Sequence, residues 1–173
     1  MRTNSVVQVG ICGLGRSGYG IHCQAIRDMP DQFQVAGVYD PLQHRAWEVA
    51  ESFDAICYDS FDAMLADPAI ELVVVASKNL MHATQARMAL EAGKHVICEK
   101  PFGLTTADVD AMMTAATVNG GILQPFQQRR YEPDFCQVKT IMESGILGEI
   151  QFVRICWHGF KRRWDWQSLF YAQ

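Results

Sequence analysis

Hydrophobic positions along the chain fall into two patterns that alternate. Short runs rich in Val, Ile and Phe are typical of buried strands, and the longer segments between them repeat apolar residues at helical spacing. Near-continuous apolar strands separated by helices are buried on both faces. The pattern therefore predicts an α/β fold, a Rossmann-type doubly wound parallel sheet with helices on both faces. The strands are expected at residues 6–12, 33–39, 55–58, 70–76, 95–98 and 122–126.

Helix boundaries are marked by residues with known end preferences. Ser60 can cap a short helix, and Gly93 is expected as a left-handed C-cap. After the second strand, a helix is expected to turn Trp47, Val49 and Ala50 inward. The other helices are predicted at about residues 17–29, 60–67, 80–92 and 106–119.

The pattern changes after Phe126. A helix is predicted from Pro133 to about Ser144, and residues 149–157 alternate like a long strand with one buried face, which is typical of an antiparallel sheet. No later strand would pair with it, so we expect an exposed edge that favours association, including a homo-oligomer. The predicted domains are a dinucleotide-binding domain, residues 1–126, and the start of an incomplete α+β domain, residues 127–173.

Composition narrows the classes of partner. Charged residues make up 20% of the 173 residues, and the net charge is −4. A net negative charge does not indicate the basic surface that nucleic-acid-binding proteins need. The longest apolar run, residues 72–76, is far shorter than the roughly twenty residues that a membrane span needs. The six cysteines show no metal-ligand spacing, so we expect no metal site, reduced thiols and a cytoplasmic location.

A glycine-rich turn, Gly13-Leu14-Gly15-Arg16-Ser17-Gly18, follows the first strand and opens the first helix. In a dinucleotide-binding turn the first glycine permits the tight bend, the second lets the backbone approach a pyrophosphate, and the third lets helix and strand pack closely. The free N–H groups at the start of the helix favour phosphate. The turn therefore predicts a dinucleotide site, and a structural turn without a ligand is the alternative.

Asp40 ends the second strand, 22 residues after Gly18. A carboxylate there can accept both ribose hydroxyls and would repel a 2′-phosphate by roughly 4 kcal/mol at close range. We therefore expect NAD, with NADP disfavoured, although Arg45 could weaken that preference. The alternative is that Asp40 only begins the turn with Pro41.

Lys100 follows the strand at residues 95–98 and is the candidate catalytic residue. Ligands in open α/β sheets bind beside the carboxyl ends of strands. A lysine there could hydrogen-bond a substrate oxygen and relay a proton during hydride transfer. Asn79 and His82 follow another strand on the same rim, where Asn79 could cap the next helix. The alternatives are a surface lysine and a packed or solvent-facing histidine.

Several motifs together resemble the glucose–fructose oxidoreductase, inositol dehydrogenase and rhizopine-catabolism (Gfo/Idh/MocA) family. The resemblance covers nearly the whole chain, and the combination is specific although each piece is not. Besides the glycine turn, the matching motifs are Asn79-Leu80-Met81-His82, Glu-Ala-Gly-Lys-His at 91–95, Glu99-Lys100-Pro101, Arg129-Arg130-Tyr131-Glu132-Pro133 and Gly145-Ile146-Leu147-Gly148-Glu149-Ile150.

The resemblance implies an NAD(P)-dependent dehydrogenase that acts on a sugar, cyclitol or related polyol. It also implies that Lys100 is the active-site lysine, that a cis peptide precedes Pro101, and that the segment from Asn79 to His82 lies near the cofactor. The predicted cofactor contacts are Gly13, Gly15, Arg16, Ser17, Gly18, Asp40, Ser77, Asn79, His82, Glu99, Lys100 and Arg130, and the predicted catalytic residue is Lys100.

Two departures from the family pattern qualify these expectations. The chain has Ser77-Lys78-Asn79 where family members commonly have Thr-Pro-Asn, and Lys78 adds a cation near the cofactor rim. The resemblance also implies a longer substrate domain, with an Asp/His pair that works with the lysine. We therefore expect this chain to bind cofactor but to have little or no activity alone. A non-enzymatic nucleotide-binding or sensing module and a structural fragment are the alternatives.

Overall fold

The computed structural model describes residues 6–156 and residue 158. The chain divides into two compact units, Met1–Phe126 and Gln127–Gln173, and each is described by itself.

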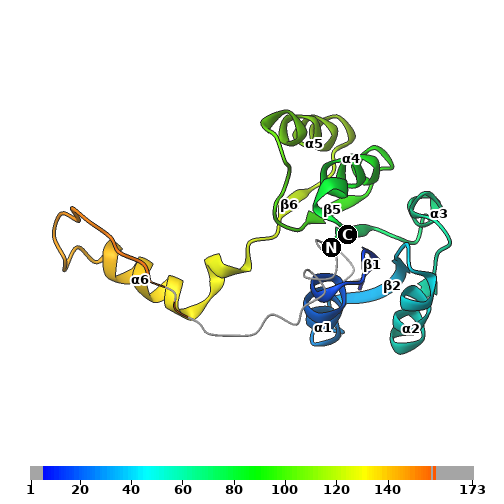
Figure 1. Ribbon diagram of the computed structural model, residues 1–173, viewed down its shortest axis with the longest axis horizontal. Coiled ribbons are helices and arrows are strands. Elements are labelled where there is room, and N and C mark those ends of the chain that lie inside the picture. Colours follow the sequence, from blue (N-terminus) through cyan, green and yellow to red (C-terminus); the bar gives the residue numbers. More distant parts are fainter. Residues whose placement is uncertain (1–5, 157, 159–173) are drawn as a thin grey trace, which may run out of the picture. The chain divides into compact units, whose positions relative to one another are not determined.

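The first unit is built on a six-stranded sheet in which every neighbouring pair is parallel (Figure 1). The strand order is β3-β2-β1-β4-β5-β6. The order reverses between β1 and β4, and ligands in doubly wound sheets bind beside the carboxyl ends of strands at such a reversal. The strands are β1 Val7–Cys12, β2 Phe33–Tyr39, β3 Ile56–Cys57, β4 Leu72–Val75, β5 His95–Cys98 and β6 Leu123–Pro125.

The predicted strands and helices are present, with ends that differ by a few residues. The first helix differs in kind, because it contains a π-helical segment, whose hydrogen bonds span one residue more than those of an α-helix. The helices of this unit are η1 (π) Gly18–Cys23, α1 Gln24–Arg27, α2 Gln43–Phe53, α3 Phe61–Ala66, η2 (3₁₀) Asn79–Met81, α4 His82–Glu91 and α5 Thr106–Asn119.

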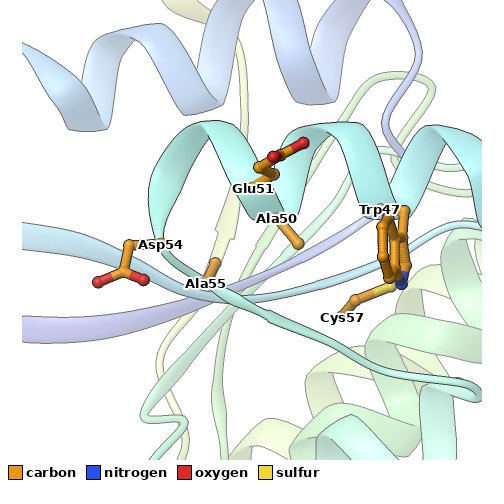
Figure 2. A pocket seen from close by; sticks show the side chains of 6 residues that line it. All are labelled: Trp47, Ala50, Glu51, Asp54, Ala55 and Cys57. Atoms are coloured by element: carbon orange, nitrogen blue, oxygen red, sulfur yellow. The ribbon is translucent and has the colours of Figure 1, made fainter.

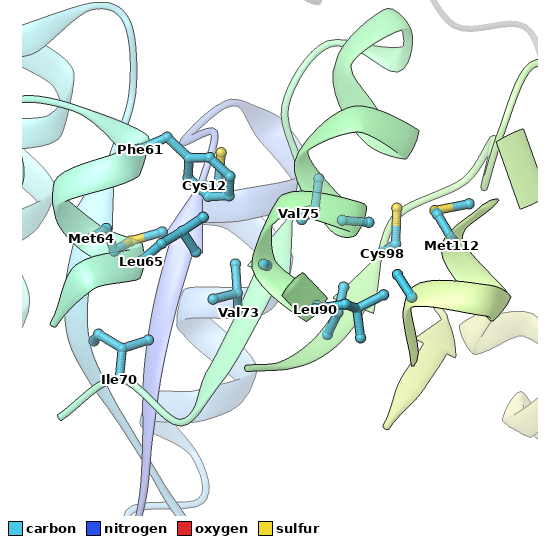
Figure 3. Packing of buried hydrophobic residues seen from close by; sticks show 14 of the residues in the cluster. Cys12, Phe61, Met64, Leu65, Ile70, Val73, Val75, Leu90, Cys98 and Met112 are labelled. Atoms are coloured by element: carbon cyan, nitrogen blue, oxygen red, sulfur yellow. The ribbon is translucent and has the colours of Figure 1, made fainter. Parts of the chain in front are cut away.

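Two hydrophobic clusters cover the two faces of the sheet. Alternation along β4 sends Val73 and Val75 into one cluster and Val74 into the other. The first cluster packs the sheet against α3, α4 and α5 (Figure 3). The second packs the opposite face against η1, α1 and α2. The carboxyl ends of the strands therefore belong to a sheet that is packed on both faces.

The inward orientation expected for Trp47 is wrong. Its side chain is 69% exposed, whereas Val49 and Ala50 are buried. The buried face of α2 is set by Ala46, Val49 and Ala50, which lie three and four residues apart. Trp47 follows Ala46 by one residue, about 100° round the helix, and therefore lies outside the buried face of α2, beside Cys57 at the edge of the sheet.

The second unit contains η3 (3₁₀) Gln128–Tyr131 and α6 Pro133–Glu143. The helix predicted from Pro133 is confirmed to within one residue. The long strand predicted after it is wrong where the structure describes it, because residues 149–156 form no strand. Trp157 lies outside the described residues. A strand is completed by hydrogen bonds to a neighbour, and the described part of this unit supplies none.

None of the helices in the described residues combines the length and the apolar character needed to cross a membrane.

Candidate cofactor-binding site

Polar residues and glycines gather where four adjacent strands end. The glycine turn follows β1, Asp40 follows β2, Ser77 lies just beyond β4, and Glu99 and Lys100 follow β5. Because the strands are parallel and adjacent in the order β2-β1-β4-β5, these residues share one rim of the sheet. The sequence predicted this shared rim for the glycine turn, Asp40 and Lys100, and their location at the strand ends is confirmed, whereas their contact with a cofactor stays a prediction.

The glycine turn is packed so tightly that its first and last glycines have no room for a side chain. Gly13 has φ +89°, and a Cβ on it would lie 2.5 Å from the Cα of Ser77. A Cβ on Gly18 would lie 1.9 Å from the carbonyl oxygen of Gly13. The positive φ of Gly13 agrees with the tight bend expected there, and the close approach at Gly18 agrees with the close packing expected of that glycine. Gly15 is half-buried, and Arg16 is exposed at the start of the helix.

Asp40 is only 4% exposed and joins β2 to the glycine turn. Its Oδ2 accepts the backbone N–H of Leu14 at 2.8 Å, and its Oδ1 accepts that of Leu42 at 2.9 Å. The guanidinium of Arg45 lies 3.5 Å from Oδ2. The carboxylate therefore holds the turn in place, and a cation stands beside it at the position where the sequence suggested one.

Glu99 is buried at the end of β5 and is surrounded by donors. Its Oε1 accepts the hydroxyl of Ser17 and lies 3.2 Å from Nε2 of His22, while its Oε2 accepts the N–H of Lys100 at 3.1 Å. Burial by itself raises the pKa of Glu99. The hydrogen bonds from His22 and Ser17, together with the nearby imidazole, outweigh it and hold that pKa below its usual value.

His22 is a site residue that the sequence did not single out for this rim. It lies in the π segment, is buried, and its ring centroid is 4.3 Å from that of Phe126. A pattern that assumes an α-helical period cannot place it, because the π segment shifts the register of the helix. No short-range signal in the sequence marks its contact with Glu99, which is 77 residues away.

Lys100 is exposed, and the peptide between it and Pro101 is cis, as the resemblance implied. Its side chain makes no hydrogen bond or ion pair within the described part of the chain. The backbone of Lys100 is therefore held by Glu99 while its amine remains available.

The buried His82 and the half-buried Ser77 form a second polar group on the rim. His82 is 1% exposed, with Nδ1 2.8 Å from the carbonyl oxygen of Pro101 and Nε2 3.1 Å from that of Ser77. The hydroxyl of Ser77 donates to Oε1 of Gln85. Asn79 is exposed, and the cap expected of it is wrong, because neither η2 nor α4 has a side-chain cap. The 3₁₀ turn that begins at Asn79 moves the start of α4 to His82.

Arg130 lies in η3 of the second unit and is exposed, so its proposed contact with cofactor stays a prediction. Among the described residues, no group of three or more His, Cys, Asp or Glu side chains could hold a metal ion.

A hollow of about 370 Å³ lies elsewhere in the unit, between α2 and the residues that lead into β3 (Figure 2). It extends along β3, from Ala55 just before the strand to Cys57 at its end. None of the predicted site residues lines it. Its walls are formed by Trp47, Ala50, Glu51, Asp54, Ala55 and Cys57.

Comparison with known proteins identifies similar sequences and folds. A model of an oxidoreductase family with an NAD-binding Rossmann fold (GFO_IDH_MocA) matches residues 7–127. The scyllo-inositol 2-dehydrogenase (NADP(+)) of Bacillus subtilis is 30% identical over 161 residues, which cover 92% of this chain and 44% of that protein. Inositol 2-dehydrogenase of Salmonella typhimurium is 31% identical over 146 residues, covering 83% of the chain and 43% of the relative.

Solved structures show the same fold. An NAD-binding protein from Listeria innocua matches with a TM-score of 0.77 and 35% identity, covering 84% of this chain and 42% of that one. The WlbA dehydrogenase from Bordetella pertussis, solved with NADH and UDP-GlcNAcA, matches with a TM-score of 0.79 and 26% identity, covering 83% and 44%. The chain thus spans less than half the length of these relatives.

Proposed function

Because the chain belongs to the Gfo/Idh/MocA family of oxidoreductases, which have an NAD-binding Rossmann fold, we propose that it is the cofactor-binding part of a nicotinamide-dependent dehydrogenase. The reaction is transfer of a hydride between nicotinamide and a hydroxyl-bearing carbon of a sugar, cyclitol or related polyol. The names of two relatives, both inositol dehydrogenases, support this substrate class.

The observation that carries the proposal is the shared rim. The glycine turn, the buried Asp40 and the available amine of Lys100 stand at the carboxyl ends of adjacent parallel strands. A turn with room for backbone but not for side chains suits the close approach of a pyrophosphate. The positive end of the dipole of the helix that follows also favours phosphate. These features fit a dinucleotide laid across the rim with its pyrophosphate at the turn.

Lys100 is the proposed catalytic residue. When bound, the nicotinamide supplies the acceptor or donor of the hydride. In oxidation of an alcohol, the carbon–hydrogen bond breaks with loss of a hydride while the hydroxyl proton leaves the oxygen. The amine of Lys100 accepts that proton, and in the reverse direction its ammonium returns one to the carbonyl oxygen. Atoms and charges then balance with no further co-reactant.

We propose NAD as the preferred cofactor. The carboxylate of Asp40 would repel a 2′-phosphate, although the guanidinium of Arg45 at 3.5 Å offsets part of that charge. We also propose that residues 127–173 begin the substrate domain, that the complete protein forms a homo-oligomer, and that this chain has little or no activity alone. The second unit supports these proposals through its largely exposed apolar side chains, including Phe152 and Ile155.

Fluorescence titration of the chain with NADH tests the proposal. We expect a saturable change, and we expect it to need at least about tenfold more NADH in Gly18→Ala, whose added methyl group has no space in the turn. Absence of a saturable change at millimolar NADH would overturn the proposal. Oxidation of inositols by the protein that carries this chain, followed by NADH absorbance, tests the substrate class. Binding without turnover of any polyol or sugar would instead favour a non-enzymatic nucleotide-binding module.

A further inference from the structure

The segment Glu99-Lys100-Pro101 is held on both sides by buried histidines. His22 lies 3.2 Å from the carboxylate of Glu99, and His82 lies 2.8 Å from the carbonyl oxygen of Pro101. Lys100 is the residue between these two attachment points. Its side chain is exposed, whereas both histidines and Glu99 are buried.

The contact on the amino side of Lys100 runs through the carboxylate of Glu99. Nε2 of His22 meets Oε1, and the other oxygen, Oε2, accepts the N–H of Lys100. The ring of His22 is also packed against Phe126, just beyond β6. The orientation of the Glu99 carboxylate, and with it the hydrogen bond to Lys100, therefore depends on a donor from η1, the helix that follows the glycine turn.

The contact on the carboxyl side runs directly to the backbone. His82 is the first residue of α4, and its two ring nitrogens face the carbonyl oxygens of Pro101 and Ser77. Carbonyl oxygens only accept hydrogen bonds, and a neutral imidazole carries a single N–H, so the ring donates to one of these oxygens and lies against the other. The ring thereby joins the segment after β5 to the segment after β4.

We propose that His22 and His82 are positioning residues that hold the backbone of Lys100 from both sides and so set where its amine meets the cofactor. This inference rests on the proposed function, which gives Lys100 its catalytic role. Neither ring is accessible enough to touch a substrate. A reacting group that is misplaced by about 1 Å can lose about a hundredfold in rate, so holding the segment at two points has a direct chemical use.

Asparagine and glutamine separate the two ring nitrogens in a test. The amide nitrogen of Asn is as many bonds from Cα as Nδ1 of His, and that of Gln is as many bonds from Cα as Nε2. His22 holds Glu99 through Nε2, so His22→Gln keeps the donor and His22→Asn removes it. His82 holds Pro101 through Nδ1, so His82→Asn keeps the donor and His82→Gln removes it.

The readout is protection of the Lys100 amine from acetylation by bound NADH, measured by peptide mass spectrometry with Lys139 as an internal reference. NADH is set at about ten times the Kd of each variant, where a fully covered amine reacts about tenfold more slowly. We expect this protection in the original chain, in His22→Gln and in His82→Asn. In His22→Asn and His82→Gln we expect it to fall below about threefold although NADH still binds. His44→Gln, at an exposed residue of α2, is the control with unchanged protection.

We expect Gln to preserve protection better than Asn at position 22, and Asn to preserve it better than Gln at position 82. A general loss of stability would not produce this reversal. The inference is overturned if the same amide, Asn or Gln, preserves protection better at both positions, or if all four variants are protected equally. Either result leaves the proposed function intact. If both variants at one position fail to fold by circular dichroism, the pair at the other position decides. Failure of the original chain to bind NADH, or binding that leaves Lys100 unprotected, overturns the proposed function itself.

Discussion

The carbonyl oxygen of Gly13 lies so close to Gly18 that a Cβ on Gly18 would be 1.9 Å away from it. The start of η1 and the residue that follows β1 are therefore in close backbone contact, which leaves no room for a side chain at Gly18. Any ligand that uses the N–H groups of this turn depends on that contact.

Alanine substitutions at two glycines of the same helix should separate this contact from general helix effects. Gly18→Ala should lower the free energy of unfolding by at least about 2 kcal/mol, because the methyl group displaces backbone. It should also weaken NADH binding at least about tenfold. Gly20→Ala has no atom within 4 Å of the new methyl group and should change stability by less than about 1 kcal/mol. Thermal unfolding measures the stability of each variant, and titration measures its NADH affinity. Equal effects of the two substitutions would contradict a specific role for the contact at Gly18.

Asp40 and Arg45 should control the choice between NADH and NADPH in opposite directions. Asp40→Asn removes a negative charge at the proposed ribose site and should raise the affinity for NADPH relative to NADH by about tenfold. Arg45→Ala removes the neighbouring cation and should lower the same ratio. Parallel fluorescence titrations give the ratio for each variant. A shift in the same direction for both would exclude a role for this pair in cofactor choice.

Lys100 and Lys94 lie on either side of β5, and replacing each by alanine should have different effects on stability and activity. Lys100→Ala should leave stability within about 0.5 kcal/mol, since the side chain is exposed, and should lower turnover of the protein that carries the chain by about 10² to 10⁴. Lys94 is buried, and its Nζ donates to the carbonyl oxygen of Asp67 at 2.7 Å. Lys94→Ala should lower the melting temperature and leave NADH affinity nearly unchanged. Loss of stability in Lys100→Ala would show that its amine has a structural partner.

Glu99 should contribute to the acid sensitivity of the fold. Its pKa is lowered in the folded state, so its stabilising effect is fully present above the unfolded value near 4.3 and is lost as pH falls through the lower, folded value. Ser17→Ala removes one of its donors and should move that pKa back toward its usual value. The melting temperature should therefore depend less steeply on pH in this variant below about pH 4. An unchanged slope would contradict the stated origin of the shift.

The buried thiols should resist alkylation at mild pH. Burial raises the pKa of Cys98 to about 12, with help from the nearby Glu99, and raises that of Cys23 to about 12. Iodoacetamide at about pH 8 should modify the exposed Cys136 and Cys156 first, because the thiolate is the reactive form. Peptide mass spectrometry identifies the modified sites. Rapid modification of Cys98 would contradict its burial, and denaturant should make all six cysteines reactive.

Elements whose residues repeat with a clear period were predicted closely. The bounds of β2, β5 and α5 coincide with those expected, because local alternation or helical spacing and strong end residues such as Gly120 define them. Trp47 was misplaced because a large apolar side chain was assumed to be inward, although its neighbours already filled the inner face of α2. The strand expected at residues 149–157 failed, in its described part, for lack of a partner.

The amino-acid sequence by itself determined the parallel sheet, the glycine turn and the rim on which Asp40 and Lys100 stand. Those features follow from period, from glycine spacing and from the rule that parallel strands end on one side. Only the tertiary structure decided that His22 meets Glu99 and that His82 meets Pro101. These contacts join residues 77 and 19 positions apart, and a π segment in one case and a 3₁₀ turn in the other lie beside them. Contacts of that kind depend on packing in three dimensions, which no local pattern records.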